Sequence, residues 1–329
     1  MSALDLDKLG DYYDGRYEGD YMARHADLEP WRVRDSLASI ALPADATVVD
    51  YGCGRGAWVP LLRATYPGAR LVGVEISPKA VHQARLDHPD AEFHAFDGRR
   101  APLPDASADL VFSYHVLEHV LDLSETVADM VRIARPGGHL VAIMPCANPG
   151  SVENLTARLI DGAFEPSSTG ERRLFCEDRG HLRRLSSEQL AACFARHGCE
   201  LVGQSYARRL AALGYLAGDT PTLRELFDPR RGRTVAGRTA LAVLRAGFFT
   251  VAALLRANRE GPGRLRQMLR EDPRPRWRLA ALGGLAALPL ATVAARLVER
   301  VLPRWEWERS AHVPRGASGQ FLVFRKAAG

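Results

Sequence analysis

The sequence is poor in the features that mark several common classes of protein. Its five cysteines are scattered and show no C-x-x-C spacing, so a disulfide framework is not expected. The chain is not repetitive, and its N-terminus lacks the basic and then apolar pattern of a secretion signal. These absences favour a globular protein in a reducing, cytoplasmic compartment.

Lysine is also scarce, because only Lys8, Lys79 and Lys326 among the 44 basic residues are lysine. Arginine therefore carries nearly all the positive charge, and it is unevenly distributed. The segment 208–310 holds 20 arginines against nine acidic residues, whereas the remainder has 24 basic and 30 acidic residues. The net charge of +5 thus hides one strongly basic segment. With 329 residues, of which 47% are hydrophobic, the chain can bury one substantial core and has room for a second unit.

What the sequence does contain is a glycine-rich turn after a short apolar segment. Residues 47–49 predict a buried strand, which is followed by the acidic Asp50. Three glycines come next at alternate positions: Gly52, Gly54 and Gly56. A backbone that approaches a ligand and then opens a helix needs residues without Cβ, and a helix start offers unpaired N–H groups. With Ala57, the glycines also match the dinucleotide pattern G-x-G-x-x-G/A, which leaves a nicotinamide cofactor as an alternative.

Apolar strands then alternate with helical segments. We expect strands at 70–74, 92–96, 109–113 and 140–144, and helices at 57–64, 78–87 and 124–134. This spacing argues for a parallel sheet covered on both faces. Ligands of such sheets bind outside the carboxyl ends of the strands, so we expect Asp50, Glu75 and Asp97 to line one crevice.

Five motifs in order give the segment 48–144 a family resemblance. They are VVDYGCGRG, LVGVEIS, FDG, PLPDASADLVFSYHVLEHV and MVRIARPGGHLVAIMP. The segment resembles the class I S-adenosylmethionine-dependent methyltransferases, in the small-molecule group that includes the ubiquinone-biosynthesis methyltransferases. The resemblance implies an α/β, Rossmann-like, doubly wound sheet of seven mostly parallel strands with an antiparallel last strand. It also implies S-adenosyl-L-methionine as cofactor, because a nicotinamide enzyme would not require the acids at Asp50 and Asp97.

The resemblance also implies roles for individual residues. The glycines would let the loop pass under the methionine part of the cofactor, and Asp50 would position its amino group. Glu75 would accept bonds from both ribose hydroxyls, Ile76 would lie against the adenine, and Asp97 would bind the adenine amine. The full set that we expect to bind the cofactor is Asp50, Gly52, Cys53, Gly54, Gly56, Glu75, Ile76, Asp97, Gly98 and Tyr114.

Methyl transfer is an in-line displacement at an activated carbon, so the protein mainly aligns the acceptor and excludes water. A hydroxyl acceptor needs a base, and histidine suits neutral pH. His115 and His119 flank Glu118 directly after the fourth strand, and we predict these two histidines as catalytic. Related O-methyltransferases carry a metal-binding acid where this chain has His115, so we predict no metal. The order H-x-x-E-H also occurs in an inverted zinc-protease motif, but here it follows a strand of a cofactor-binding fold, which argues against a protease.

The polar segment 147–180 is expected to be irregular, to lie outside the sheet and to shape the acceptor pocket. Cys176 and His181 are metal-ligand types, but two candidates do not make a site. For His181 we expect packing or loop anchoring, with the substrate pocket as the alternative. The N-terminal tyrosines are expected to pack a helix onto the sheet, with closure over a ligand as the alternative. These are Tyr12, Tyr13, Tyr17 and Tyr21.

Strands expected at 200–206 and 320–325 would form the family's terminal antiparallel pair, which makes the segment between them an insertion. We therefore divide the chain into four parts. They are an aromatic arm and helix (1–46), an S-adenosylmethionine-binding domain (47–207), a basic, apolar helical insertion (208–316) and the final strand of the catalytic domain (317–329).

The insertion holds two apolar helical tracts, 234–257 and 279–295, and the second has no charge across 17 residues. That length is at the lower edge of what a spanning helix needs. We favour a lid or a homodimer interface, with attachment to a membrane surface through 230–310 as the alternative, because arginine and tryptophan border the tracts. The arginines alternate with alanine and leucine rather than with stacking aromatics, so nucleic acid is not expected.

The sequence therefore predicts a cytoplasmic S-adenosylmethionine-dependent methyltransferase. Its acceptor would be an oxygen or nitrogen of a small molecule or a lipid-linked intermediate. Binding of the insertion to the bilayer would make it peripheral to the inner face of the membrane. The alternatives are a membrane-attached or oligomeric binding protein without turnover and a nicotinamide-dependent oxidoreductase.

Overall fold

The computed structural model of the protein describes residues 6–17, 30–167, 169–177, 180–218, 220–271 and 274–328. Much of the predicted N-terminal arm, Tyr21 included, lies outside the described residues. A seven-stranded sheet forms the centre, in the order β3-β2-β1-β4-β5-β9-β8. The strands are β1 Thr47–Tyr51, β2 Arg70–Glu75, β3 Glu92–Ala95, β4 Ala108–Tyr114, β5 Ala134–Pro145, β8 Cys199–Ala207 and β9 Gly319–Lys326.

The pairing of the strands confirms the predicted fold class. Neighbours among β1 to β5 run parallel, whereas β9 is antiparallel to both β5 and β8. The central strands β1, β2 and β4 are buried along nearly their whole length, as strands covered on both faces must be. Because the order reverses between β1 and β4, the connections that leave the carboxyl ends of these two strands run in opposite directions and leave room for a ligand between them.

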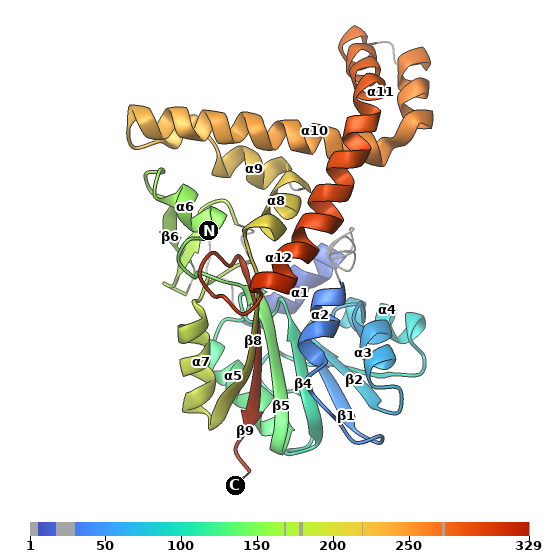
Figure 1. Ribbon diagram of the computed structural model, residues 1–329. Coiled ribbons are helices and arrows are strands. Elements are labelled where there is room, and N and C mark those ends of the chain that lie inside the picture. Colours follow the sequence, from blue (N-terminus) through green and yellow to red (C-terminus); the bar gives the residue numbers. More distant parts are fainter. Residues whose placement is uncertain are drawn as a thin grey trace.

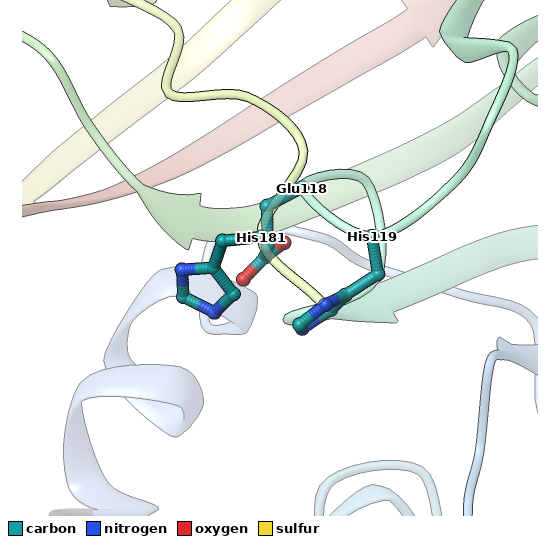
Figure 2. A group of neighbouring side chains, drawn as sticks. All are labelled: Glu118, His119 and His181. Atoms are coloured by element: carbon teal, nitrogen blue, oxygen red, sulfur yellow. The ribbon is translucent and has the colours of Figure 1, made fainter. Parts of the chain in front are cut away.

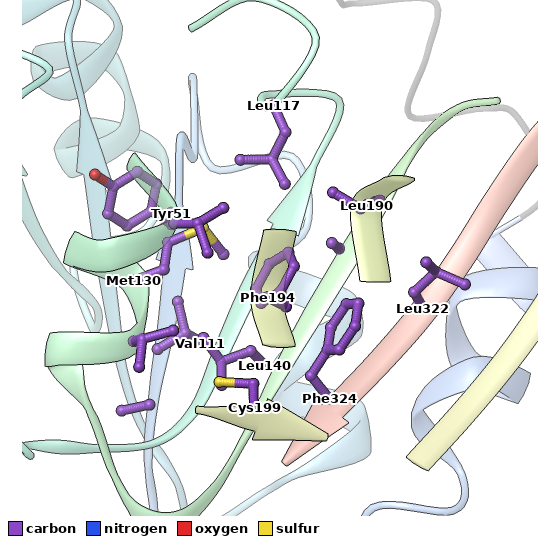
Figure 3. Close-up of a cluster of buried hydrophobic side chains, with 14 of the residues drawn as sticks. Tyr51, Val111, Leu117, Met130, Leu140, Leu190, Phe194, Cys199, Leu322 and Phe324 are labelled. Carbon is purple, nitrogen blue, oxygen red and sulfur yellow. The ribbon is translucent and has the colours of Figure 1, made fainter. Parts of the chain in front are cut away.

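Helices cover the two faces of the sheet (Figure 1). On one face α5 (Leu123–Ile133) and α7 (Ser187–Arg196) bury an apolar cluster that Figure 3 shows, in which Phe194 stacks on Phe324 at 4.0 Å. On the other face lie α2 (Pro30–Leu37), α3 (Val59–Thr65) and α4 (Pro78–Asp87). Ser77 begins α4 as predicted, since its side chain accepts a hydrogen bond from Ala80 N.

Two segments are more regular than the sequence indicated. The segment 147–180 lies outside the main sheet as predicted, but it contains a helix and a small hairpin. These elements are α6 Val152–Ala157, β6 Phe164–Pro166 and β7 Arg172–Leu174. Strand β5 also begins six residues earlier than expected, at Ala134, and a register shift opposite Ala108 absorbs its glycine pair.

The chain between β8 and β9 is helical, as Figure 1 shows. Its elements follow in this order: α8 Arg209–Gly218, α9 Thr220–Leu226, the short η1 Pro229–Arg231, α10 Val235–Glu271, α11 Pro275–Ala295, the π-helical η2 Arg296–Val301 and α12 Leu302–Ser310. Helix α10 bends at Gly261, which has a φ of 68° and is followed by Pro262. Beyond the bend it packs against α11, where Gly284 allows the close approach of Leu265.

The inserted helices are anchored to the sheet at their C-terminal end. Trp307 of α12 lies edge-on to Trp31 of α2 at 5.6 Å and to Phe321 of β9 at 5.3 Å. At the other end α9 and α10 form a separate apolar cluster, in which Phe227 stacks on Phe248 at 4.7 Å. The hairpin of α10 and α11 is therefore fixed at its base, while its far end stands away from the sheet (Figure 1).

Candidate active site

A cavity opens at the carboxyl ends of β1, β2, β3 and β4, where the fold predicts a ligand. The empty space between its walls, with the open mouth included, is roughly 850 Å³. The residues that line it are Tyr13, Tyr17, Tyr51, Gly52, Glu75, Ile76, Phe96, Gly98, Tyr114, His115, Val116, His119, Val120, Leu121, Asp122, Glu125 and Thr126.

The glycine turn follows β1 and is packed tightly on its neighbours. Gly52, Gly54 and Gly56 all have positive φ, between 53° and 79°. A Cβ on Gly52 would overlap Val116, and one on Gly54 would lie 2.6 Å from Tyr17 Oη. The turn thus requires glycine both for its backbone conformation and for lack of space.

Of the predicted cofactor residues in the turn, only Gly52 reaches the wall of the cavity. Cys53 is buried beneath it, and the amide N–H groups of Gly52 and Cys53 both donate to Val74 O. Gly54 and Gly56 are buried as well and do not line the cavity. Tyr17 is the residue that lies over Gly54.

Glu75 ends β2 with its carboxylate buried on the cavity wall. Oε2 accepts a hydrogen bond from Gly54 N at 3.0 Å, and Oε1 accepts from Ile76 N at 2.9 Å and Ser77 N at 3.1 Å. Burial raises the pKa of Glu75, and the hydrogen bonds from the three amides offset part of this rise. The backbone therefore fixes the carboxylate in place, and a lone pair of Oε2 stays available to a ligand.

The other two acids that we expected in the crevice lie off its wall. Asp50 is 3% exposed within β1, and its Oδ2 accepts no hydrogen bond from any described residue. Burial, and then the charge of Glu75, raises the pKa of Asp50 to about 8. Asp97 is exposed, and its Oδ1 accepts from Arg99 N at 2.9 Å within its own turn. Its neighbours Phe96 and Gly98 reach the cavity instead.

Helix α1 (Leu6–Tyr17) covers one side of the cavity. Tyr13 and Tyr17 are both buried and both line the cavity, so they pack onto the domain and face the ligand space at once. Asp14 anchors the helix by accepting hydrogen bonds from the Ser77 hydroxyl and, at 3.3 Å, from Lys79 N. An acid at the start of α4 also complements the helix dipole there. Arg55 adds a second tie by donating to the carbonyl of Tyr17.

The two predicted catalytic histidines stand in different environments. His115 lines the cavity, has a φ of 54° and is 26% exposed, and its Nδ1 lies 2.9 Å from Glu118 Oε1. His119 is buried, and its Nδ1 lies 2.9 Å from the carbonyl of Gly180. Burial, followed by the neighbouring His181, lowers the pKa of His119 to about 4. Burial alone would raise the pKa of Glu118, but His115, His119 and His181 lower it to about 2.

His181 comes from a distant segment and joins this group, with its ring 4.7 Å from that of His119. Arg183, a residue that the sequence did not single out, holds the two segments together. Its guanidinium is buried and donates to the carbonyls of Leu117, at 2.9 Å, and Leu121, at 3.1 Å. It also bonds the carbonyl of Val120 and pairs with Glu171 at 2.7 Å.

Replacing Arg183 with methionine should lower the free energy of unfolding by about 3–5 kcal/mol, since it leaves three carbonyls and a carboxylate without their donor. Urea unfolding followed by circular dichroism measures the change. The exposed Arg99→Met is the matched control and should change stability by less than about 0.5 kcal/mol. Equal effects of the two substitutions would contradict the role given to Arg183.

Comparisons with known proteins identify a family. A family model described as a methyltransferase domain matches residues 22–204, more than half of the chain. Trans-aconitate 2-methyltransferase of Azoarcus sp. (strain BH72) is 38% identical over 37% of this chain and 48% of its own. A probable chloroplastic tocopherol O-methyltransferase of Oryza sativa subsp. japonica is 32% identical over 41% of this chain and 40% of its own.

The matched region thus spans less than half the length of these two curated relatives. Among solved structures, a putative sarcosine dimethylglycine methyltransferase from Galdieria sulphuraria aligns with 91% of this chain and 86% of its own. That alignment has a TM-score of 0.46 and 14% sequence identity.

Proposed function

Because the chain belongs to the class I S-adenosylmethionine-dependent methyltransferase family, we propose that it transfers a methyl group from S-adenosyl-L-methionine to an oxygen or nitrogen of a small molecule or a lipid-linked intermediate. The observation that carries the proposal is the buried carboxylate of Glu75, held by three amides on the wall of a cavity beside the glycine turn. A carboxylate fixed in this way suits the two hydroxyls of a ribose.

Other residues of the cavity fit the same cofactor. Ile76 and Phe96 offer apolar surface next to Glu75, and Gly52 brings backbone against the ligand space. Asp50 Oδ2 is a buried acceptor that lacks a donor within the described protein, which would suit an amino group. Bound there, the cofactor supplies a methyl group already activated by a sulfonium.

The chain's own residues would align the acceptor and handle its proton. Tyr13 and Tyr17 cover the cavity and exclude water. We assign the base to His115, because its ring faces the cavity and Glu118 orients it through Nδ1, which leaves Nε2 to take the proton. The low pKa of His119 makes it a weak base near neutral pH.

Mass spectrometry of the small molecules released on denaturing the purified protein tests the proposal. We expect S-adenosylmethionine or S-adenosylhomocysteine. Release of a nicotinamide nucleotide would instead support an oxidoreductase. A released sulfonium nucleoside without transfer of a labelled methyl group to any acceptor in a cell extract would support a binding protein without turnover.

We further propose that the hairpin of α10 and α11 binds the surface of an anionic membrane. Both helical stretches, Val235–Glu271 and Arg278–Ser310, are long and apolar enough to cross a membrane, with a mean hydropathy of 1.7 in their most apolar windows. Only 28% and 17% of those windows are buried, whereas a core helix of a globular protein would be mostly buried. Large apolar side chains on α10 and α11 are therefore exposed: Val235, Val243, Leu279, Leu282, Leu290 and Val293.

Positive charge at the far end of the hairpin indicates that the proposed partner is negatively charged. Six exposed arginines cluster there, which we call the arginine tip: Arg264, Arg266, Arg270, Arg274, Arg276 and Arg278. Apolar side chains beside clustered cations suit a bilayer with anionic headgroups. A lid receives less support, because no described residue of 208–316 lines the cavity. A dimer stays the alternative to the membrane.

A further inference from the structure

We propose that Glu118, His119 and His181 form a binding site for one divalent metal ion of the zinc type. Figure 2 shows the three side chains converging, with the carboxylate of Glu118 between the two imidazoles. Their ligand atoms all lie within 4.8 Å of one another. Zinc bonds of about 2.0–2.2 Å require ligand atoms roughly 3.3–4 Å apart, so small rotations of these side chains would complete the site.

The buried carboxylate of Glu118 indicates that a cation binds here. Its side chain is fully buried, and Oε2 accepts no hydrogen bond from any residue that the structure describes. Oε1 lies 2.9 Å from His115 Nδ1, and Figure 2 shows the carboxylate between the imidazoles of His119 and His181. A buried carboxylate with an unused oxygen is costly unless a cation or donor meets it.

The backbone contact of His119 prepares its ring for a metal. Its Nδ1 lies 2.9 Å from the carbonyl oxygen of Gly180. A carbonyl only accepts, so Nδ1 must carry the hydrogen, and Nε2 keeps its lone pair for a ligand. Histidines that bind metals are typically oriented by such a hydrogen bond to the second nitrogen.

His181 is placed just as firmly although it lies more than 60 residues further along the chain. Leu182 N donates to the carbonyl of Glu118 at 2.8 Å, and Arg183 bonds the loop that carries Glu118 and His119. Two segments are therefore tied together on both sides of the proposed site. The sequence predicted no metal because His115 stands where related enzymes carry an acid, and because Cys176 and His181 alone do not make a site.

The donor set indicates the class of metal. Two imidazole nitrogens and one carboxylate favour Zn²⁺ or a neighbouring transition metal over Mg²⁺ or Ca²⁺, which prefer oxygen. Three protein ligands also leave a coordination position open, as in catalytic zinc sites. His119 lines the cavity, so this position is accessible from the space proposed for the acceptor.

The site narrows the class of acceptor, and this step rests on the proposed methyltransferase activity. A metal ion lowers the pKa of an oxygen that it binds, so it would favour an acceptor with a hydroxyl or carboxylate group. His115 contacts Glu118 and lines the cavity, so it would lie beside an acceptor bound at this site. Nitrogen acceptors gain less from such a site.

Calorimetric titration with ZnCl2 of the chelator-treated, untagged full-length protein tests the site. We expect one Zn²⁺ to bind per chain. When Co²⁺ replaces Zn²⁺, we expect visible absorption stronger than that of hydrated Co²⁺, as is typical of four- or five-coordinate cobalt. His181→Ala and Glu118→Gln should each weaken Zn²⁺ binding by about 100-fold or more, since even partners outside the ligand shell are worth 10–100-fold. His82→Ala, which removes an exposed histidine, should leave affinity unchanged.

Circular dichroism confirms the fold of each variant, and His181→Ala keeps the test decisive if Glu118→Gln does not fold. Absence of Zn²⁺ binding, or equal affinity in the wild type and both folded variants, would overturn the proposal. Titration of the same samples with S-adenosylhomocysteine separates the two proposals. Binding of the nucleoside without the metal would refute the metal site alone, whereas binding of the metal without the nucleoside would refute the methyltransferase.

Discussion

Replacing Glu75 with alanine is expected to weaken the binding of S-adenosylhomocysteine by at least about 100-fold. The substitution removes the acceptor proposed for two ribose hydroxyls, and each hydrogen bond to a charged group is worth about 1.5–3 kcal/mol. Since about 1.4 kcal/mol corresponds to a factor of ten, losing both bonds gives a loss of this size or larger. Isothermal titration calorimetry of the wild type and the variant measures it.

Asp97→Ala is the informative companion to Glu75→Ala. Its carboxylate is exposed and bonds amides of its own turn, so we expect a loss of no more than about tenfold. The exposed Glu92→Ala, at the opposite end of β3, controls for the removal of a carboxylate away from the cavity. A folded Glu75→Ala protein that binds as tightly as the wild type would show that the cofactor does not rest on this carboxylate.

The second large effect concerns the membrane. Full-length protein should float with vesicles that contain phosphatidylserine, and changing Arg264, Arg266, Arg270 and Arg276 to glutamate should abolish flotation. Each basic residue near an anionic surface contributes about 1 kcal/mol, so losing four of them lowers the partition coefficient by roughly 10³-fold. All four are exposed, so the fold should be unaffected.

A matched variant carries the same change of net charge elsewhere, at the exposed residues Arg99, Arg172, Arg196 and Arg315. This variant should float like the wild type. If both variants still float, or the wild type never does, the hairpin does not bind anionic bilayers through its arginine tip. Light scattering on the same samples then decides whether the exposed apolar faces form a dimer instead.

The sheet could be predicted because its signals are local. Runs such as Thr47–Val49 and Leu71–Val74 are apolar and short, and helices with clear starts, such as the one after Ser77, separate them. The glycine turn was also predictable from three glycines at alternate positions after a strand, and the structure shows why Gly52 is needed: its φ is positive and a Cβ would have no space. The antiparallel pairing of β9 with β8 followed from the family resemblance rather than from periodicity.

The histidine cluster was beyond sequence reasoning because contacts between distant segments create it. The sequence predicted only packing or loop anchoring for His181. In the structure, hydrogen bonds from Arg183 hold its segment against the turn after β4. Nothing in the sequence distinguished Arg183 from the chain's many other arginines. The separate environments of Asp50 and Asp97 were equally hidden, since a position at a strand end does not fix where the side chain points.

The central claim is that the ends of β1 to β4, with α1 above them, hold the nucleoside of S-adenosylmethionine. Diffraction from crystals grown with S-adenosylhomocysteine tests it most directly. The account predicts electron density for the nucleoside in the cavity, with the ribose oxygens against the carboxylate of Glu75. Density for the nucleoside at another surface, or a cavity that stays empty at saturating ligand, would contradict it.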